Sequence, residues 1–521
     1  MAGLHVDLKS APDLILLGGT GITLSPELPG AEAVAVSGGL ILAVGPARDI
    51  VALAGRRTEF VYCEGKCVVP GFYDAHMHLL ASASKRLSVD CSPPAVSSIS
   101  QIQAVIREQT ELVPPGTWIR AGNYDEFQLL ERRHPTRRDL DEASPDHPVK
   151  LQHRSLHACV MNSAALHIAG IDGNSAIDGI VPDVVPLTHE PTGLVYEYGD
   201  YLSARVIPPL RESDLRRGLL QVMEDLLSEG ITSVQDATFN NGMCDWGRLE
   251  ELRSEPGPRP RVGFMIGQKH LGEFIERKLG PGFGDEWLWV GPVKFMCTET
   301  PGSFDPPLEE LKAGIRKARS HGYHVAIHAV DESTAFMAIE ALADRNHRAA
   351  GAFDRIEHGS ILPPFLLDRL VELQLAVVTQ PSFLYHSGDR YLADLDEHVR
   401  PWLYPIGSLL ARAVLVAAGS DAPVSPAKPL EGICAAVTRL SRRGSAVVQE
   451  ESVSVNDALR LYTTGAARVC GELARKGSIE PGKLADMVIL SEDPFSVNPN
   501  DIKDIEVEMT IVGGRVAWAK E

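Results

Sequence analysis

Short apolar segments alternate with amphipathic ones through the middle of this chain, and this alternation constrains the fold more than any other feature. The segment 307–322 is typical of the amphipathic class, because its apolar residues recur at the three- and four-residue spacing of one helix face. Strands that alternate with helices form parallel sheets, and eight such units close into a (β/α)8 barrel, or TIM barrel. We predict this α/β fold, with barrel strands that end within the segments 74–78, 233–236, 263–266, 293–296, 325–328, 356–358, 377–380 and 416–421.

Both ends of the chain contain short apolar runs separated by glycine, which is typical of strands and hairpins. A small sheet has to bury one face, and pairing the two ends achieves this. We therefore predict a composite β-sandwich domain of residues 1–68 and 476–521, beside a barrel domain of residues 69–475.

The segment 80–212 separates the first two barrel strands, and it is far longer than an ordinary connection of about 2–6 residues. Such a segment must fold around a core of its own. We predict that this insertion forms a substrate cap over the catalytic face of the barrel.

Composition excludes several classes of function. The 521 residues include 50 basic and 69 acidic ones, a formal net charge of −19, so nothing electrostatic favours binding to nucleic acid or to an anionic membrane. No apolar run approaches the roughly 18 residues that span a bilayer, and the opening sequence MAGLHVDLKS lacks the features of a signal peptide. The eight scattered cysteines are too few for a disulfide framework, so we expect a cytoplasmic protein.

Residues of the types that bind metal ions stand at the ends of several predicted barrel strands. His76 and His78 end the first strand, and because alternate residues of a strand point to one side, both imidazoles can face one metal ion. Four further candidates end other strands: Lys294, His328, His358 and Asp421. A barrel keeps its catalytic groups at the C-terminal ends of its strands, so the sequence predicts a metal centre there.

Each of these residues also has a structural interpretation that the sequence leaves open. The histidines can be ordinary residues of the barrel core. Asp421 can cap a helix, because aspartate is favoured at that position. Lys294 can form a simple ion pair with an acid such as Glu299.

The motifs around these residues resemble those of the amidohydrolase superfamily over nearly the full length of the chain. They include PGFYDAHMH at the first strand, GSDAP at the last strand and IEPGKLADMVIL near the C-terminus. Within the insertion, three segments resemble the branch typified by N-substituted formamide deformylase: WIRAGNYDEF at 118–127, HPTRRDLDEASPDHPV at 134–149 and HACVMNSAAL at 157–166.

This resemblance implies an enzyme that hydrolyses a non-peptide carbon–nitrogen bond, of amide or formamide type, in a small-molecule substrate. The water would be activated by one or two divalent metal ions, with zinc expected. The implied ligands are His76 and His78 for the first ion, His328 and His358 for the second, a carboxylated Lys294 as the bridge of a binuclear centre, and Asp421 on the first ion. Asp421 would also carry a proton from the water to the leaving nitrogen.

Two loops depart from the pattern of this branch. After Lys294 the chain reads CTETPGSFD at 297–305, with Glu299 as the nearest acid, where the branch often has Asp-Gly. Ser155 and Leu156 precede His157 where the branch often has an aspartate. Both loops are expected to border the substrate, so the resemblance gives four candidates for substrate binding: Tyr124, His157, Asn162 and Glu299.

Other functions stay open at this point. A deaminase or a cyclic amidohydrolase on the same barrel is the alternative, because fold does not fix function. A catalytically silent scaffold is a remote alternative, since such a chain is expected to have lost a ligand and all the ligand positions are present. Barrels of this family often pair, so the resemblance also implies a homodimer.

Overall fold

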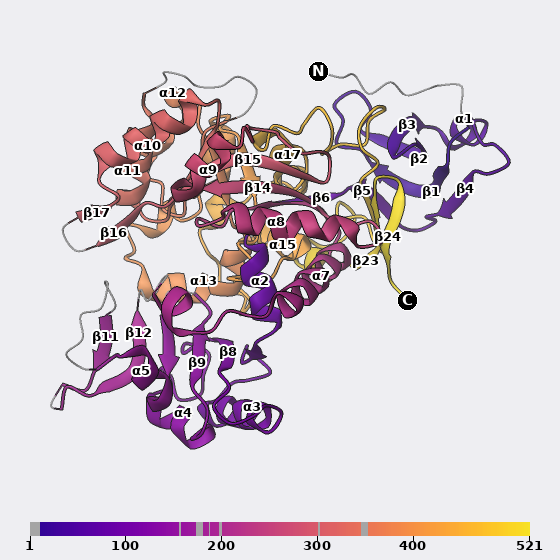
Figure 1. Ribbon diagram of the computed structural model, residues 1–521. Helices are drawn as coiled ribbons and strands as arrows, with labels where there is room; N and C mark the ends of the chain where they lie inside the picture. Colours follow the sequence, from indigo (N-terminus) through magenta and orange to yellow (C-terminus); the bar gives the residue numbers. More distant parts are fainter. Residues whose placement is uncertain are drawn as a thin grey trace. The chain divides into compact units, whose positions relative to one another are not determined.

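The computed structural model describes residues 11–155, 158–172, 181–186, 188–196, 201–300, 303–344 and 353–521. The chain divides into two compact units. One unit is the insertion, Leu80–Val222, and the other combines Met1–Leu79 with Met223–Glu521. Figure 1 shows the course of the chain through both.

The larger unit contains a sheet of eight parallel strands, which confirms the predicted (β/α)8 barrel. Its last strand is joined to its first, because the Asp421 N–H donates to the His76 carbonyl and the His78 N–H donates to the Ala422 carbonyl, both at 2.8 Å. The order is β6 (Phe72–Met77), β13 (Ile231–Asp236), β14 (Arg261–Gly267), β15 (Leu288–Phe295), β18 (Val325–Ala329), β19 (Arg355–His358), β20 (Ala376–Thr379) and β21 (Val416–Ala418).

Helices alternate with these strands (Figure 1). The segment predicted at 307–322 forms α10 (Leu308–Ser320), which buries Leu311, Ile315 and Ala318 at helical spacing. The other helices of this unit are α1 (Ala47–Val51), α8 (Met243–Glu251), α9 (Leu271–Glu276), α11 (Glu332–Leu342), α12 (Pro364–Leu373), α13 (Ser382–Asp394), α14 (Ile406–Ala411), α15 (Pro429–Thr438), α16 (Val455–Leu461) and α17 (Thr464–Val469), and α7 (Glu212–Ser228) leads into β13. Among the described residues, no helix combines the length and the apolar character that crossing a membrane requires.

Strands from both ends of the chain share one sheet, as the glycine-separated apolar runs indicate. Its order is β24 (Arg515–Ala519), β23 (Val507–Val512), β22 (Met487–Leu490), β5 (Cys67–Pro70), β1 (Leu14–Ile22), β2 (Gly30–Ser37) and β3 (Leu40–Gly45), with β4 (Glu59–Tyr62) paired to β1. This arrangement does not confirm a sandwich of two sheets, and the predicted domain boundaries stay a prediction.

The insertion has a sheet and a core of its own. Its apolar residues pack into one buried cluster that includes Ile102, Ala121, Leu140 and Leu151. The sheet order is β11 (Val181–Val184), β12 (Pro191–Tyr196), β10 (Ala158–Met161), β9 (Val149–His153), β8 (Ile119–Tyr124) and β7 (Val89–Asp90). Its helices are α2 (Leu79–Arg86), which begins at the last residue of the other unit, α3 (Ile99–Glu111), α4 (Arg137–Ala143) and α5 (Ser163–Ala169).

Candidate metal centre

Four imidazoles meet at the C-terminal ends of the barrel strands. The ring centroids of His78 and His76 are 5.3 Å apart, those of His76 and His358 are 4.8 Å apart, and those of His358 and His328 are 4.5 Å apart. His76 is on β6, His328 on β18 and His358 on β19, and His78 directly follows β6. The strand ends therefore bring together residues that lie up to 282 positions apart in sequence, from His76 to His358.

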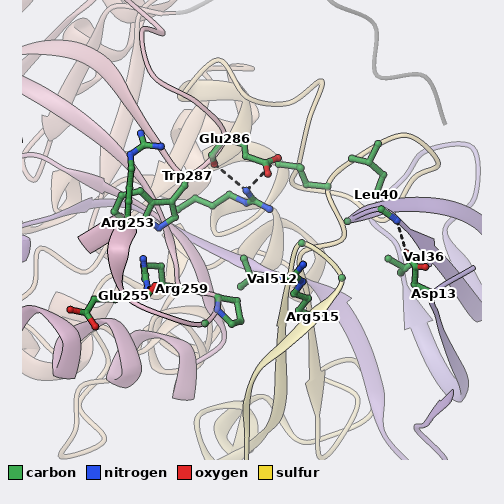
Figure 2. A pocket seen from close by; sticks show the side chains of 18 residues that line it. Asp13, Val36, Leu40, Arg253, Glu255, Arg259, Glu286, Trp287, Val512 and Arg515 are labelled. Atoms are coloured by element: carbon green, nitrogen blue, oxygen red, sulfur yellow. Dashed lines mark hydrogen bonds and ion pairs between the residues drawn. The ribbon is translucent and has the colours of Figure 1, made fainter. Parts of the chain in front are cut away.

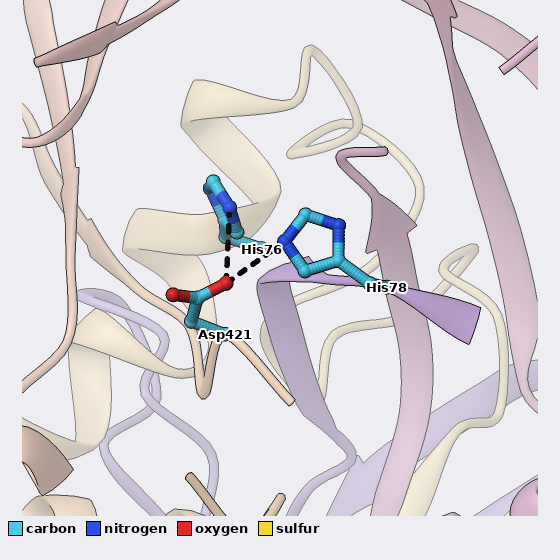
Figure 3. Close-up of side chains that lie close together, drawn as sticks. All are labelled: His76, His78 and Asp421. Carbon is cyan, nitrogen blue, oxygen red and sulfur yellow. Dashed lines mark ion pairs between the residues drawn. The ribbon is translucent and has the colours of Figure 1, made fainter. Parts of the chain in front are cut away.

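Asp421 lies against the first two of these histidines. Its Oδ1 atom is 2.9 Å from His78 Nε2 and 3.5 Å from His76 Nε2 (Figure 3). Burial opposes ionisation, but the two histidines hold the pKa of Asp421 well below its usual range. The three side chains together can offer ligand atoms to one metal ion.

The backbone around Asp421 rules out the helix-cap interpretation. The next helix, α15, begins at Pro429 with Lys428 as its cap residue. Asp421 instead adopts a left-handed conformation with φ of 57°, and His358 does the same with φ of 73°. Such backbone persists where the surroundings fix it and is concentrated at functional sites.

Lys294 is a buried amine that faces the same centre. Its side chain is 2 % exposed, and its Nζ makes no hydrogen bond within the part of the chain that the structure describes. Burial lowers the pKa of Lys294 to about 8. The ion pair with Glu299 is not formed, because Glu299 is exposed on β16 (Thr298–Thr300) and accepts a hydrogen bond from the Ser333 hydroxyl.

Hydrogen bonds fix three of the imidazole rings through their Nδ1 atoms. His78 Nδ1 lies 3.1 Å from the Thr238 hydroxyl oxygen, and His358 Nδ1 lies 2.9 Å from Gln380 Oε1. His76 Nδ1 contacts a Glu357 carboxylate oxygen. Metal-ligating histidines characteristically use one ring nitrogen in this way, which leaves Nε2 for the ion.

Glu357 connects His76 to a buried arginine. Its other oxygen, Oε1, accepts a hydrogen bond from Arg355 Nε at 2.5 Å. Although burial opposes ionisation, Arg355 and His76 hold the pKa of Glu357 well below its usual range. Burial and the nearby Lys294 lower the pKa of His76 to about 3, so its ring is neutral and can act as a ligand.

Sequence reasoning did not identify Glu357, Arg355, Gln380 or Thr238. A signal was present for two of them, because Arg355 and Glu357 stand at alternate positions of a short buried strand. Two charged residues on one side of a buried strand need partners inside the barrel.

The residues predicted to bind substrate lie in different places. Tyr124 is fully buried in the insertion, where its hydroxyl contacts His134 Nδ1 at 2.9 Å. Glu299 is an exposed residue of the larger unit, and His157 lies outside the described residues.

Asn162 is engaged entirely within the insertion. Its Nδ2 donates to the carbonyls of Ser144 and His147 at 3.1 and 2.8 Å, and its Oδ1 accepts from the N–H groups of Val149 and Ala165 at 2.9 and 3.0 Å. All the usual hydrogen-bonding sites of the amide are thus occupied, which favours the structural role for this residue.

A cavity of about 910 Å³ lies elsewhere in the larger unit (Figure 2). Arg253 and Arg259 stand over the ring of Trp287 on its wall, at 5.6 and 5.5 Å from the ring centroid. None of the predicted metal ligands lines this cavity. The barrel-strand ends therefore remain the candidate site.

The donor set at the strand ends fits a divalent metal ion. Imidazole nitrogens and a carboxylate suit zinc and similar transition metals. The buried, unbonded Nζ of Lys294 and the unbonded Nε2 of His76 within the described structure are polar atoms that an ion or its ligands would satisfy. Barrel and ligand cluster together define a class of protein, the metal-dependent hydrolases built on a (β/α)8 barrel.

Comparison with known proteins gives the family. The model of the amidohydrolase family matches residues 59–517, so the chain belongs to the amidohydrolase family. YtcJ of Bacillus subtilis is 29 % identical over 528 residues, which cover 96 % of this chain and 99 % of YtcJ. N-substituted formamide deformylase of Arthrobacter pascens is 28 % identical over 544 residues, which cover 98 % of each chain.

The fold is also similar to that of a solved structure. The crystal structure of an uncharacterized metal-dependent hydrolase from Pyrococcus horikoshii matches with a TM-score of 0.75 and 25 % sequence identity, over 93 % of this chain and 99 % of that one. The protein is accordingly a metal-dependent hydrolase that acts on carbon–nitrogen bonds in a small-molecule substrate.

Proposed function

We propose that this enzyme hydrolyses the carbon–nitrogen bond of an N-substituted amide or formamide. The observation that carries the proposal is the contact of one carboxylate, Asp421, with both His76 and His78 at the strand ends. Support for the substrate class comes from N-substituted formamide deformylase, which is similar to this chain along its full length.

We infer that His76 and His78 hold one divalent ion, zinc by preference, and that His328 and His358 hold a second. A bound ion of this kind lowers the pKa of its water and polarises the substrate carbonyl. Lys294 supports a binuclear centre, because burial favours the neutral form of its amine, and this form can attack carbon dioxide and release a proton. The resulting carbamate would be an anion whose oxygens suit a divalent ion.

Asp421 has the chemistry of the group that moves the proton. It is ionised and therefore accepts a proton as the water attacks the substrate carbonyl. The same carboxyl group then donates this proton to the nitrogen, and the carbon–nitrogen bond breaks. The products are an amine and a carboxylic acid, which is formic acid when the substrate is a formamide.

We propose that the insertion selects the substrate, with Tyr124 and His157 as contacts, and that Glu299 borders the substrate on the barrel side.

A cytoplasmic location is supported by the eight cysteines, all of which are free thiols. A homodimer is proposed from family membership alone and is tested by sedimentation.

The substrate class is tested with a panel of compounds and zinc-loaded protein. The panel contains N-alkyl and N-aryl formamides, longer N-acyl amines, carbamates and cyclic ureides. We expect release of amine together with formate from the formamides. Turnover confined to cyclic ureides, or release of ammonia from an aromatic amine, would contradict the proposal and favour the alternative reactions.

A further inference from the structure

The insertion contains a second cluster of side chains of the types that bind metal ions, separate from the cluster at the barrel strand ends. Glu126 lies two residues beyond the end of β8, and His153 is the last residue of the adjacent parallel strand β9. The register pairs Tyr124 with His153, so the ends of the two strands lie together. His134 belongs to the segment between β8 and α4.

Both histidines present Nε2 toward Glu126. His153 Nε2 is 2.7 Å from Glu126 Oε2, and His134 Nε2 is 3.9 Å from Glu126 Oε1. The two imidazole centroids are 5.8 Å apart. Asp125, Glu126 and His153 offer ligand atoms that lie within 4.8 Å of one another, and an ion among them would need bonds of about 2.0–2.2 Å to nitrogen and oxygen.

The other nitrogen of each ring is held in place by a hydroxyl group. His134 Nδ1 lies 2.9 Å from the Tyr124 hydroxyl, and His153 Nδ1 lies 2.7 Å from the Ser155 hydroxyl. A hydroxyl oxygen that accepts the Nδ1 proton leaves a lone pair on Nε2. This is the arrangement that orients histidine ligands in metal sites.

Burial and charge favour a cation at this place. The side chain of His153 is 5 % exposed, and its Nε2 faces the Glu126 carboxylate at 2.7 Å inside the insertion. Burial opposes ionisation of Glu126, but His153 and His134 lower the pKa of its carboxyl group to about 2.

Asp125 and Arg154 are two charged residues beside this cluster. Asp125 accepts hydrogen bonds from the Phe127 N–H at 3.0 Å and from the Gln128 side chain at 2.9 Å. It also pairs with Arg154 at 3.3 Å. Asp125 thus offsets the charge of the arginine, and the carboxylate of Glu126 faces both imidazoles.

We propose that Glu126, His134 and His153 bind a divalent transition-metal ion, zinc by preference, at a site within the insertion. Two imidazoles and one carboxylate are a common zinc donor set, and water or Asp125 supplies a fourth ligand. The ion ties the segment that carries His134 to the ends of β8 and β9. The competing arrangement is a metal-free pair in which the Ser155 N–H, 3.2 Å from His153 Nδ1, donates to that atom and the ring proton sits on Nε2.

The test counts zinc ions in the full chain. After chelation and dialysis against free zinc, the metal content of the wild type is compared with that of Glu126→Gln, His134→Asn and His167→Asn. His167 is an exposed residue of α5 in the same unit and serves as the matched control. We expect Glu126→Gln and His134→Asn each to lose one equivalent, or at least tenfold in affinity, while His167→Asn binds as the wild type does.

Equal zinc content and affinity in all four proteins would overturn the proposal. A second measurement does not depend on how the variants fold. Crystals of the zinc-loaded wild type are examined by anomalous scattering at the zinc edge. A peak between Glu126 and the two histidines is expected, and peaks confined to the barrel would reject the site whatever activity the enzyme shows.

Discussion

Glu357→Gln tests how the barrel orients a metal ligand. The carboxylate of Glu357 contacts His76 Nδ1 with one oxygen and Arg355 Nε with the other. Glutamine has the same shape but offers one oxygen and one NH2 group. If its oxygen faces Arg355, the NH2 group faces Nδ1, and the ring proton has to move to Nε2. If its oxygen faces His76, the NH2 group meets the guanidinium and Arg355 loses its anion.

Both outcomes weaken the metal centre. Removing the partner that orients a histidine ligand typically costs 10- to 100-fold in metal affinity. This corresponds to about 1.4–2.8 kcal/mol. Breaking the fully buried Arg355–Glu357 pair also lowers the free energy of unfolding, on the order of 3–5 kcal/mol.

The assay is a competition titration of zinc between the protein and a chromophoric chelator, made on protein shown to be folded by circular dichroism. Glu431→Gln is the matched control, because Glu431 on α15 lies 2.9 Å from His386 on α13 and forms a histidine–carboxylate pair outside the centre. We expect a higher zinc Kd for Glu357→Gln alone. An unchanged zinc Kd with unchanged kcat would refute the orienting role of Glu357.

Three further predictions concern single residues. Asp421→Asn removes the proton carrier and should lower kcat by about 10²–10⁴ with an unchanged circular dichroism spectrum; a near wild-type kcat would leave Asp421 a structural role only. Burial lowers the pKa of Lys294 from 10.5 to about 8. Below pH 8 the charged amine therefore destabilises metal-free protein by about 3 kcal/mol, and the free energy of unfolding rises as the pH increases from 8 to 10.5. Lys294→Met should therefore stabilise metal-free protein near neutral pH in denaturant titrations, with a gain that shrinks toward pH 10.5. A gain independent of pH would show that the buried charge of Lys294 is not its cause. Asn162→Ala should lower the free energy of unfolding by about 1–3 kcal/mol without changing KM, and a higher KM at unchanged stability would instead place Asn162 against the substrate.

The barrel and the positions of its polar residues could be predicted because both depend on local pattern. Apolar segments of strand length alternate with amphipathic helices, and parallel strands of a barrel have their C-terminal ends on one side. A polar residue at such an end, as at His328 or Asp421, is therefore close to the others whatever the details of packing.

The supporting contacts could not be predicted, because they depend on side-chain geometry between distant strands. Glu357 and its partner His76 are 281 positions apart. In sequence Glu357 is only a charged residue beside a candidate ligand. The sheet order of the insertion could not be predicted either, because no local sequence pattern distinguishes the parallel pairing of β8 with β9 from the antiparallel pairing of β9 with β10.

Hydrolysis of a carbon–nitrogen bond at the barrel strand ends requires water activated by a metal ion. The direct measurement is the release of formate and amine from an N-substituted formamide by protein stripped of metal and then reloaded with zinc. We expect no turnover in the stripped protein and full recovery with one or two equivalents of zinc. Undiminished turnover by metal-free protein would contradict this requirement.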